Sequence, residues 1–114
     1  MIDYNDELVS VLETVLPTYH ELTLTSKCEI PCISWQERNN YVRANGDTLG
    51  YSVLTFTIKI WGRTQEDIIR YSLEVDKVMR PIGFVRTSSN ELYDRNSTMR
   101  QKILTYEALG QEQF

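Results

Sequence analysis

The sequence predicts an α+β fold in which a mostly antiparallel sheet carries two helices on one face. Two adjacent observations predict it: an unbroken alternating run from Tyr51 to Trp61, typical of a strand, and directly after it the clearest amphipathic helix of the chain. A strand that leads into such a helix supplies a sheet face together with its cover. With the flanking patterns, the expected order of elements is α-β-β-β-α-β-β. A length of 114 residues supports one modest core, so residues 1–114 are expected to form a single domain.

The run from Tyr51 to Trp61 has two different faces. One parity carries four large apolar residues, Leu54, Phe56, Ile58 and Ile60. Because side chains alternate across a strand, this set predicts a buried face. The other parity, with Thr57, Lys59 and Trp61, predicts a polar and aromatic face that is partly solvated or covered by another subunit. Such a difference favours an antiparallel sheet.

The helix that follows has clear boundaries. Thr64 stands as N-cap, and Asp67 three residues later is a weaker form of the capping-box partner. Pro81 and Gly83 end the helix, and Gly83 is expected to take a positive φ because glycine enters that region without strain. Helical spacing defines a stripe of Ile68, Ser72, Val75 and Met79, with Ile69 and Leu73 at its margins.

The N-terminal part, residues 1–17, is expected to be a helix whose periodic pattern spans Asp3–Leu16. Pro17 prevents its continuation. A short strand from Tyr19 to Thr25 follows, and then an extended segment from Glu29 to Asn39. These two segments supply the first two strands of the expected order.

Residues 39–50 form a polar segment between two strands and are predicted to be a projecting loop. The segment exceeds the usual length of a hairpin connection, so it is either functional or a mobile solvent loop. Loops often carry function, and Tyr and Arg are enriched at interface hot spots. The loop and the strand ends beside it are therefore expected to contact neighbouring subunits. The candidate interface residues are Asn39, Asn40, Tyr41, Arg43, Asn45 and Trp61.

After the second helix the patterns weaken. Phe84–Thr87 begins a strand, Ser88–Glu91 and Asp94–Ser97 are predicted to be turns, and Thr98–Glu107 is expected to be the last strand. The alternation of this last strand is poor, which suggests partners on both faces or an edge position. Residues 108–114 are expected to form a loose tail.

The charge balance limits the possible partners. The formal net charge is −4, whereas a nucleic-acid-binding domain usually shows a basic face, so sequence-specific DNA binding is not expected. No apolar run is long enough to span a membrane, and no signal peptide is expected. The chain is expected to stay in the cytosol of its producer unless an assembly carries it out.

No catalytic residue, cofactor site or metal site is expected. His20 is the sole histidine and has no partner that the sequence identifies, and the five glycines form no phosphate-binding motif. A zinc site would recruit His20 together with Cys28 and Cys32 and would still need a fourth ligand. Two free thiols are the preferred alternative, because four residues of extended chain hold the cysteine Cα atoms roughly 13 Å apart.

Several short motifs, taken in order, resemble the tail terminator proteins of long-tailed bacteriophages, also called tail completion or head–tail joining proteins. In that family a strand similar to ISxxExN precedes a long strand that ends near a Trp. A helix that ends in VM is then followed by a short gap and GF. The resemblance spans Tyr19 to Tyr106. The matching positions are Ile33, Ser34, Glu37, Asn39 or Asn40, Trp61, Val78, Met79, Gly83 and Phe84.

The resemblance implies a structural protein of the virion and not an enzyme. Such proteins form a ring, usually a hexamer, that caps the finished tail tube, ends its polymerisation and joins the tail to the head connector. DNA passes through the lumen of the ring. The implied partners are further copies of this chain, the tail tube protein and the head connector, in the host cytoplasm during assembly and then in the virion. Two alternatives are another phage head, neck or tube-related ring subunit, and a small non-enzymatic binding module unrelated to phage.

Overall fold

The computed structural model describes residues 3–23, 28–43 and 51–111. The order α-β-β-β-α-β-β and the α+β class are confirmed. Within the described residues the elements are α1 (Asn5–Leu12), β1 (Thr18–His20), the 3-10 helix η1 (Glu21–Thr23), β2 (Cys32–Arg43), β3 (Tyr51–Gly62), α2 (Gln65–Met79), β4 (Val85–Asp94) and β5 (Met99–Gln111).

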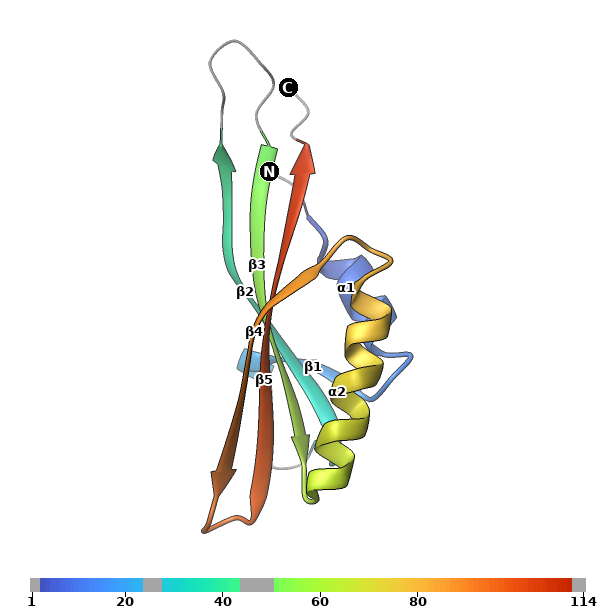
Figure 1. The fold of residues 1–114 in the computed structure, drawn as a ribbon, viewed down its shortest axis with the longest axis vertical. Coiled ribbons are helices and arrows are strands. Elements are labelled where there is room, and N and C mark those ends of the chain that lie inside the picture. Colours follow the sequence, from blue (N-terminus) through green and yellow to red (C-terminus); the bar gives the residue numbers. More distant parts are fainter. Residues whose placement is uncertain (1–2, 24–27, 44–50, 112–114) are drawn as a thin grey trace.

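The strands form a mixed sheet in the order β1-β2-β3-β5-β4. All neighbours are antiparallel except β1, which runs parallel to the first part of β2. Both helices lie on one face of the sheet, as expected (Figure 1). The fold is elongated, at 54 × 24 × 23 Å. β2, β3 and β5 extend beyond the helices at one end, and the β4–β5 hairpin forms the other end (Figure 1).

The core lies between the sheet and the helices. The apolar parity of β3 is buried as expected, and Leu54, Phe56, Ile58 and Ile60 are all 0% exposed. β5 continues this face, because Phe56 pairs with Tyr106 and Ile58 pairs with Leu104. Full burial of one such side chain contributes about 1.5–3 kcal/mol. The helices and their ends add Leu8, Leu12, Leu16, Ile68, Val75, Met79 and Phe84.

Both ends of α2 follow the sequence signals. Thr64 has an extended backbone, and its side chain accepts a hydrogen bond from the backbone N–H of Asp67. After the helix, Gly83 has a φ of +90°, which confirms the expected turn. The next residue, Phe84, donates its N–H to the carbonyl of Met79 at 3.2 Å. This bond satisfies a carbonyl that the helix leaves without an internal partner.

The N-terminal helix is shorter than the predicted residues 1–17, since it runs only from Asn5 to Leu12. The backbone N–H of Thr14 donates to the carbonyl of Val11 at 3.2 Å, and its hydroxyl donates to the same oxygen at 2.6 Å. A threonine hydroxyl that bonds nearby backbone competes with the helical pattern. The helix therefore ends before Pro17 is reached.

The first two strands also have other bounds than expected. β1 stops at His20, and Glu21–Thr23 forms η1 where a strand from Tyr19 to Thr25 was predicted. Residues 24 and 25 lie outside the described residues. β2 begins at Cys32 instead of Glu29. The parallel pairing of β1 with Ile33–Trp35 fixes this start, and hydropathy alone does not reveal such a pairing.

Residues 39–43 belong to β2 and are not part of a loop. The β2–β3 ladder runs from Cys32 opposite Trp61 to Arg43 opposite Tyr51, with a bulge between Glu37 and Asn39. The predicted projecting loop is therefore mainly the end of a projecting strand pair. The rest of that segment, residues 44–50, lies outside the described residues.

The C-terminal half contains longer strands than predicted. β4 is continuous through Ser88–Glu91, where a turn was expected, because each of these residues pairs with β5. A bulge between Arg86 and Ser88 takes up the irregular alternation. β5 continues to Gln111, so residues 108–111 are paired with β3 and do not form a loose tail. Only the turn over Asp94–Ser97 stays close to its expected place.

Candidate functional site

The sheet face opposite α1 and α2 is here called the open face. Uncharged polar and apolar side chains dominate it. The described residues that alternation and pairing assign to this face include Cys32, Ser34, Gln36, Asn39 and Tyr41 on β2, Val53, Thr55, Thr57, Lys59 and Trp61 on β3, Gln101, Ile103, Thr105, Glu107 and Leu109 on β5, and Val85, Ser88, Asn90 and Leu92 on β4.

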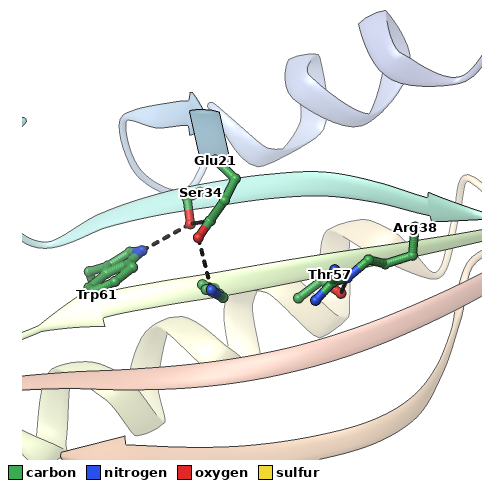
Figure 2. Close-up of polar contacts among 6 residues, drawn as sticks. Glu21, Ser34, Arg38, Thr57 and Trp61 are labelled. Carbon is green, nitrogen blue, oxygen red and sulfur yellow. Dashed lines mark hydrogen bonds and ion pairs between the residues drawn. The ribbon is translucent and has the colours of Figure 1, made fainter. Parts of the chain in front are cut away.

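A connected polar cluster lies on the open face where η1 meets β2 and β3. The Ser34 hydroxyl donates to Oε2 of Glu21 at 2.6 Å, and Nζ of Lys59 donates to Oε1 of the same carboxylate at 2.8 Å. The Trp61 indole N–H donates to Oγ of Ser34 at 2.9 Å. Figure 2 shows Glu21, Ser34 and Trp61 converging on one point. We call these four residues the Glu21 cluster.

The Glu21 cluster holds a charge that is partly removed from water. Burial by itself raises the pKa of the Glu21 carboxyl, but the hydrogen bonds from Lys59 and Ser34 outweigh this effect and keep the pKa below its usual value. The Glu21 and Lys59 side chains are each 23% exposed, so their ion pair is better shielded from solvent than a surface pair. The cluster fixes η1 against the sheet and immobilises Trp61.

A second contact lies further along the same face. Arg38, at the bulge of β2, donates from Nε to Oγ1 of Thr57 at 3.1 Å (Figure 2). Thr57 is buried although α1 and α2 lie on the other side of the sheet. A bulge redirects a side chain that regular alternation would place elsewhere. Here it brings a guanidinium onto the open face.

The structure places four of the six predicted interface residues on the projecting part of β2. Asn39 and Tyr41 lie on the open face of the projecting part of β2, and Tyr41 is 43% exposed. Asn40 lies on the opposite face, where its amide donates to Oε1 of Glu37 at 3.1 Å. Arg43 ends β2 opposite Tyr51.

The remaining two predicted residues do not join this group. Trp61 shares the open face, but it lies at the other end of β3, opposite Cys32. Tyr41 pairs with Val53, which precedes Trp61 by about eight residues, or roughly 27 Å of strand. Asn45 lies outside the described residues.

The sequence alone did not reveal Glu21, Arg38 or the role of Ser34 in this site. A partial signal was present, since Lys59 and Trp61 share the polar parity of the long strand. The pairing of Ser34 with Lys59 across β2 and β3 completes the cluster, and that register is a tertiary property. Arg38 reaches the face only because of the bulge, which has no reliable sequence signature.

The described residues hold no group of three or more His, Cys, Asp or Glu side chains that could bind a metal ion. His20 packs its ring edge-on against Trp35, with centroids 4.7 Å apart. Cys28 and Cys32 are both free, and burial, together with the neighbouring Cys28, raises the pKa of the Cys32 thiol to about 11. A thiol with such a pKa is almost entirely protonated at neutral pH and is a poor nucleophile.

In the part of the chain that the structure describes, no helix has both the length and the apolar character needed to cross a membrane.

The fold is a small twisted sheet that α1 and α2 cover on one side, while the short η1 lies against the other side. The fold is shared with a chain from a solved structure, the virion of a native gene transfer agent (GTA) particle. That chain is 13% identical in sequence, and the alignment covers 92% of this chain and 84% of the other, with a TM-score of 0.61. No protein-family model and no curated protein matches the sequence. The similarity at this identity establishes a common fold.

Proposed function

We propose that this chain is a tail terminator, a virion protein that forms a ring on the end of a phage tail tube. The ring ends tube polymerisation and joins the tail to the head connector. The observation that carries the proposal is the fold likeness to a chain of a phage-like virion particle over 92% of the sequence. The order of short motifs, from Ile33 to Phe84, supports the particular role of terminator within such a particle.

The shape and the surfaces support a structural role. A subunit that must contact two neighbours, a tube and a connector needs several surfaces on a rigid body. This fold offers a projecting strand end with Asn39 and Tyr41 at one extremity and the β4–β5 hairpin at the other (Figure 1). Tyrosine is enriched at the energetic centres of protein interfaces. We place contacts with neighbouring copies or with the tail tube at this projecting end.

Passage of DNA through the ring requires a lumen that does not hold phosphate. Each Lys or Arg that contacts a phosphate adds affinity through counterion release. The chain carries a formal net charge of −4, and Lys59 on the open face is neutralised by Glu21 at 2.8 Å. In the proposed role DNA is a passing cargo, and the protein needs no catalytic residue and no cofactor.

The proposal is tested by adding purified protein to tail tubes and imaging the mixture by negative stain, with native mass spectrometry of the protein alone. We expect a ring, a hexamer in the family that the sequence resembles, seated on one end of each tube. Rings that form but do not bind the tubes would instead indicate a head or neck ring subunit. A monomer that binds no tube would overturn the proposal in favour of a small binding module.

The projecting end is tested by the double substitution Tyr41→Ala, Arg43→Ala. Loss of an interface anchor typically costs 2 kcal/mol or more, about 30-fold in affinity, so we expect a normal melt but no rings and no capped tubes. The matched control is Arg70→Ala, Leu73→Ala, which removes one arginine and one exposed apolar residue from α2. If the Tyr41/Arg43 variant caps tubes as well as the control does, the projecting end is not an interface.

A further inference from the structure

We propose that a pocket at the C-terminal end of α2 is a carboxylate-binding site, and that the acidic start of α1 in another copy of this chain, with Asp6 and Glu7, supplies the carboxylate. The charged groups of this pocket lie on the helix side of the sheet. The inference rests on the proposed function, because it identifies one contact between neighbouring copies in the ring.

The pocket has a volume of about 410 Å³ and forms where α2 ends and β4 begins. Asp76 lies in the last turn of α2, Arg80 is the C-cap of that helix, and Arg86 is the second residue of β4. The turn at Gly83, with a φ of +90°, directs the chain from the helix into the strand and brings both arginines to one carboxylate. The full lining consists of Asp76, Arg80, Gly83, Phe84, Val85 and Arg86.

The carboxylate of Asp76 is held in place from the sheet side. The hydroxyl of Tyr106, a buried residue of β5, donates to Oδ1 of Asp76 at 2.7 Å. Nε of Arg86 lies 3.9 Å from the same oxygen, and Nη2 of Arg80 lies 4.0 Å from Oδ2. Both nitrogen–oxygen distances exceed the roughly 2.7–3.2 Å of a hydrogen bond. The two guanidinium groups therefore surround Asp76 without donating a hydrogen bond to it.

A second carboxylate suits this arrangement. Two arginines against one aspartate leave the pocket with a surplus of one positive charge. A guanidinium group binds a carboxylate through two parallel N–H···O bonds, which makes arginine the preferred partner for this anion. The side chains of Arg80 and Arg86 are 80% and 47% exposed, so an incoming carboxylate reaches both without displacing the core.

The start of α1 carries groups of this kind. Residues 3–23 contain five acidic side chains and no Lys or Arg. Two of the acids, Asp6 and Glu7, are exposed and adjacent in the first turn of α1. The acidic start of α1 and the two arginines of the pocket are therefore complementary in charge, and both belong to surfaces that another copy can reach.

The two charged surfaces lie at the same level along the molecule. The ring of Tyr4, the N-cap of α1, packs edge-on against the ring of Phe84, with centroids 5.8 Å apart. Phe84 also lines the pocket. Figure 1 shows the start of α1 beside the connection from α2 to β4. A rotation about an axis along the length of the molecule therefore keeps the acids of one copy level with the pocket of the next.

The two surfaces also belong to opposite sides of the molecule. α1 leads into β1, whereas the pocket includes Arg86 of β4, and the strand order β1-β2-β3-β5-β4 separates these strands. Asp76 shows which side of α2 the pocket occupies, because it binds Tyr106 of β5 and faces Arg86. A contact between two different surfaces repeats from copy to copy and closes into a ring when the rotation closes.

Charge reversal tests the contact. Arg80→Glu, Arg86→Glu and, separately, Asp6→Lys, Glu7→Lys each place like charges opposite each other, which opposes association. For either variant we expect the protein concentration at half-assembly to rise at least about tenfold at about 0.1 M salt, as measured by native mass spectrometry over a dilution series. The variant with all four substitutions exchanges the charges and should assemble within about threefold of the parent protein.

Two further variants complete the experiment. The matched control Arg63→Glu, Arg95→Glu reverses two exposed arginines outside the pocket and should assemble like the parent protein. A thermal melt checks the fold of every variant. If Arg80→Glu, Arg86→Glu lowers the melting temperature, Arg80→Gln, Arg86→Gln replaces it, and the expected rise in half-assembly concentration is then at least about threefold.

The outcomes separate this contact from the proposed function. Folded single-surface variants that assemble like the control, or a four-substitution variant that is not rescued, would overturn the contact and leave the tail terminator role intact. Rings of the arginine variant that form normally but no longer cap tubes would assign the pocket to a carboxylate of the tail tube and overturn its assignment to α1. A parent protein that forms no ring and binds no tube would overturn both the contact and the proposed function.

Discussion

At the scale of single residues, Glu21 connects three elements through one carboxylate, since Ser34 and Lys59 both donate to it. Its folded-state pKa lies below its usual value, so its contribution to stability is present above about pH 4.5 and is lost as the pH falls through the folded-state pKa. We expect Glu21→Gln to lower the free energy of unfolding at pH 7 by about 1–2 kcal/mol. The difference from wild type should fade toward pH 3, as measured by urea titration.

The matched control for this experiment is Glu13→Gln, which makes the same chemical change at an exposed position after α1. Its effect should stay within about 0.5 kcal/mol at both pH values. An equal loss for the two variants at pH 7, or a Glu21→Gln loss that persists unchanged at pH 3, would show that the ion pair with Lys59 contributes nothing to stability.

Single residues with strong local preferences could be placed from the sequence. Thr64 caps α2 and Gly83 leaves it with positive φ, because both roles depend on chemistry within a few residues. The Glu21 cluster could not be placed in this way. It joins positions 21, 34, 59 and 61, and only the pairing of β2 with β3 brings them together.

At the scale of elements, the turn after α2 depends on Gly83. An added Cβ would meet no atom within 4 Å, so substitution there costs backbone strain and causes no clash. We expect Gly83→Ala to lower the free energy of unfolding by about 1–2 kcal/mol. Gly83→Asn should cost less, because asparagine enters the left-handed region more readily. Chemical denaturation of both variants measures this order, and a neutral Gly83→Ala would refute the strain.

The strongly patterned elements were predicted well and the edges poorly, for a physical reason. β3 lies between two strands with one face on the core, so its alternation is complete. β4 has a neighbour on one side only and every residue exposed, so Ser88, Ser89 and Asn90 carry little burial constraint and resemble a turn. β5 pairs with β3 on one side and with β4 on the other along most of its length. Its continuation past Glu107 follows from its pairing with β3.

At the scale of the whole molecule, the fold class followed from the sequence because one strand and one helix adjoin and share a core. The surfaces proposed for assembly did not follow from the sequence, because the pairing of all the strands decides which strands lie at the edges of the sheet. Asn39 and Tyr41 were predicted as interface residues of a loop, and the structure places them on a strand edge. Their interface role stays a prediction.

The distribution of charge over the whole molecule leads to a last prediction. If the open face lines a channel for DNA, the wild-type ring should not retain duplex DNA in a filter-binding assay at about 0.1 M salt, since exposed phosphate contacts are few. The double variant Gln101→Lys, Glu107→Lys adds lysines to the open face, where a concave channel concentrates their field. It should bind DNA at least about tenfold more tightly, with an affinity that falls steeply as salt rises. The matched control Gln65→Lys, Glu74→Lys makes the same charge change on exposed positions of α2 and should bind far less. Equal retention by the two variants would mean that the open face does not line the path of the DNA.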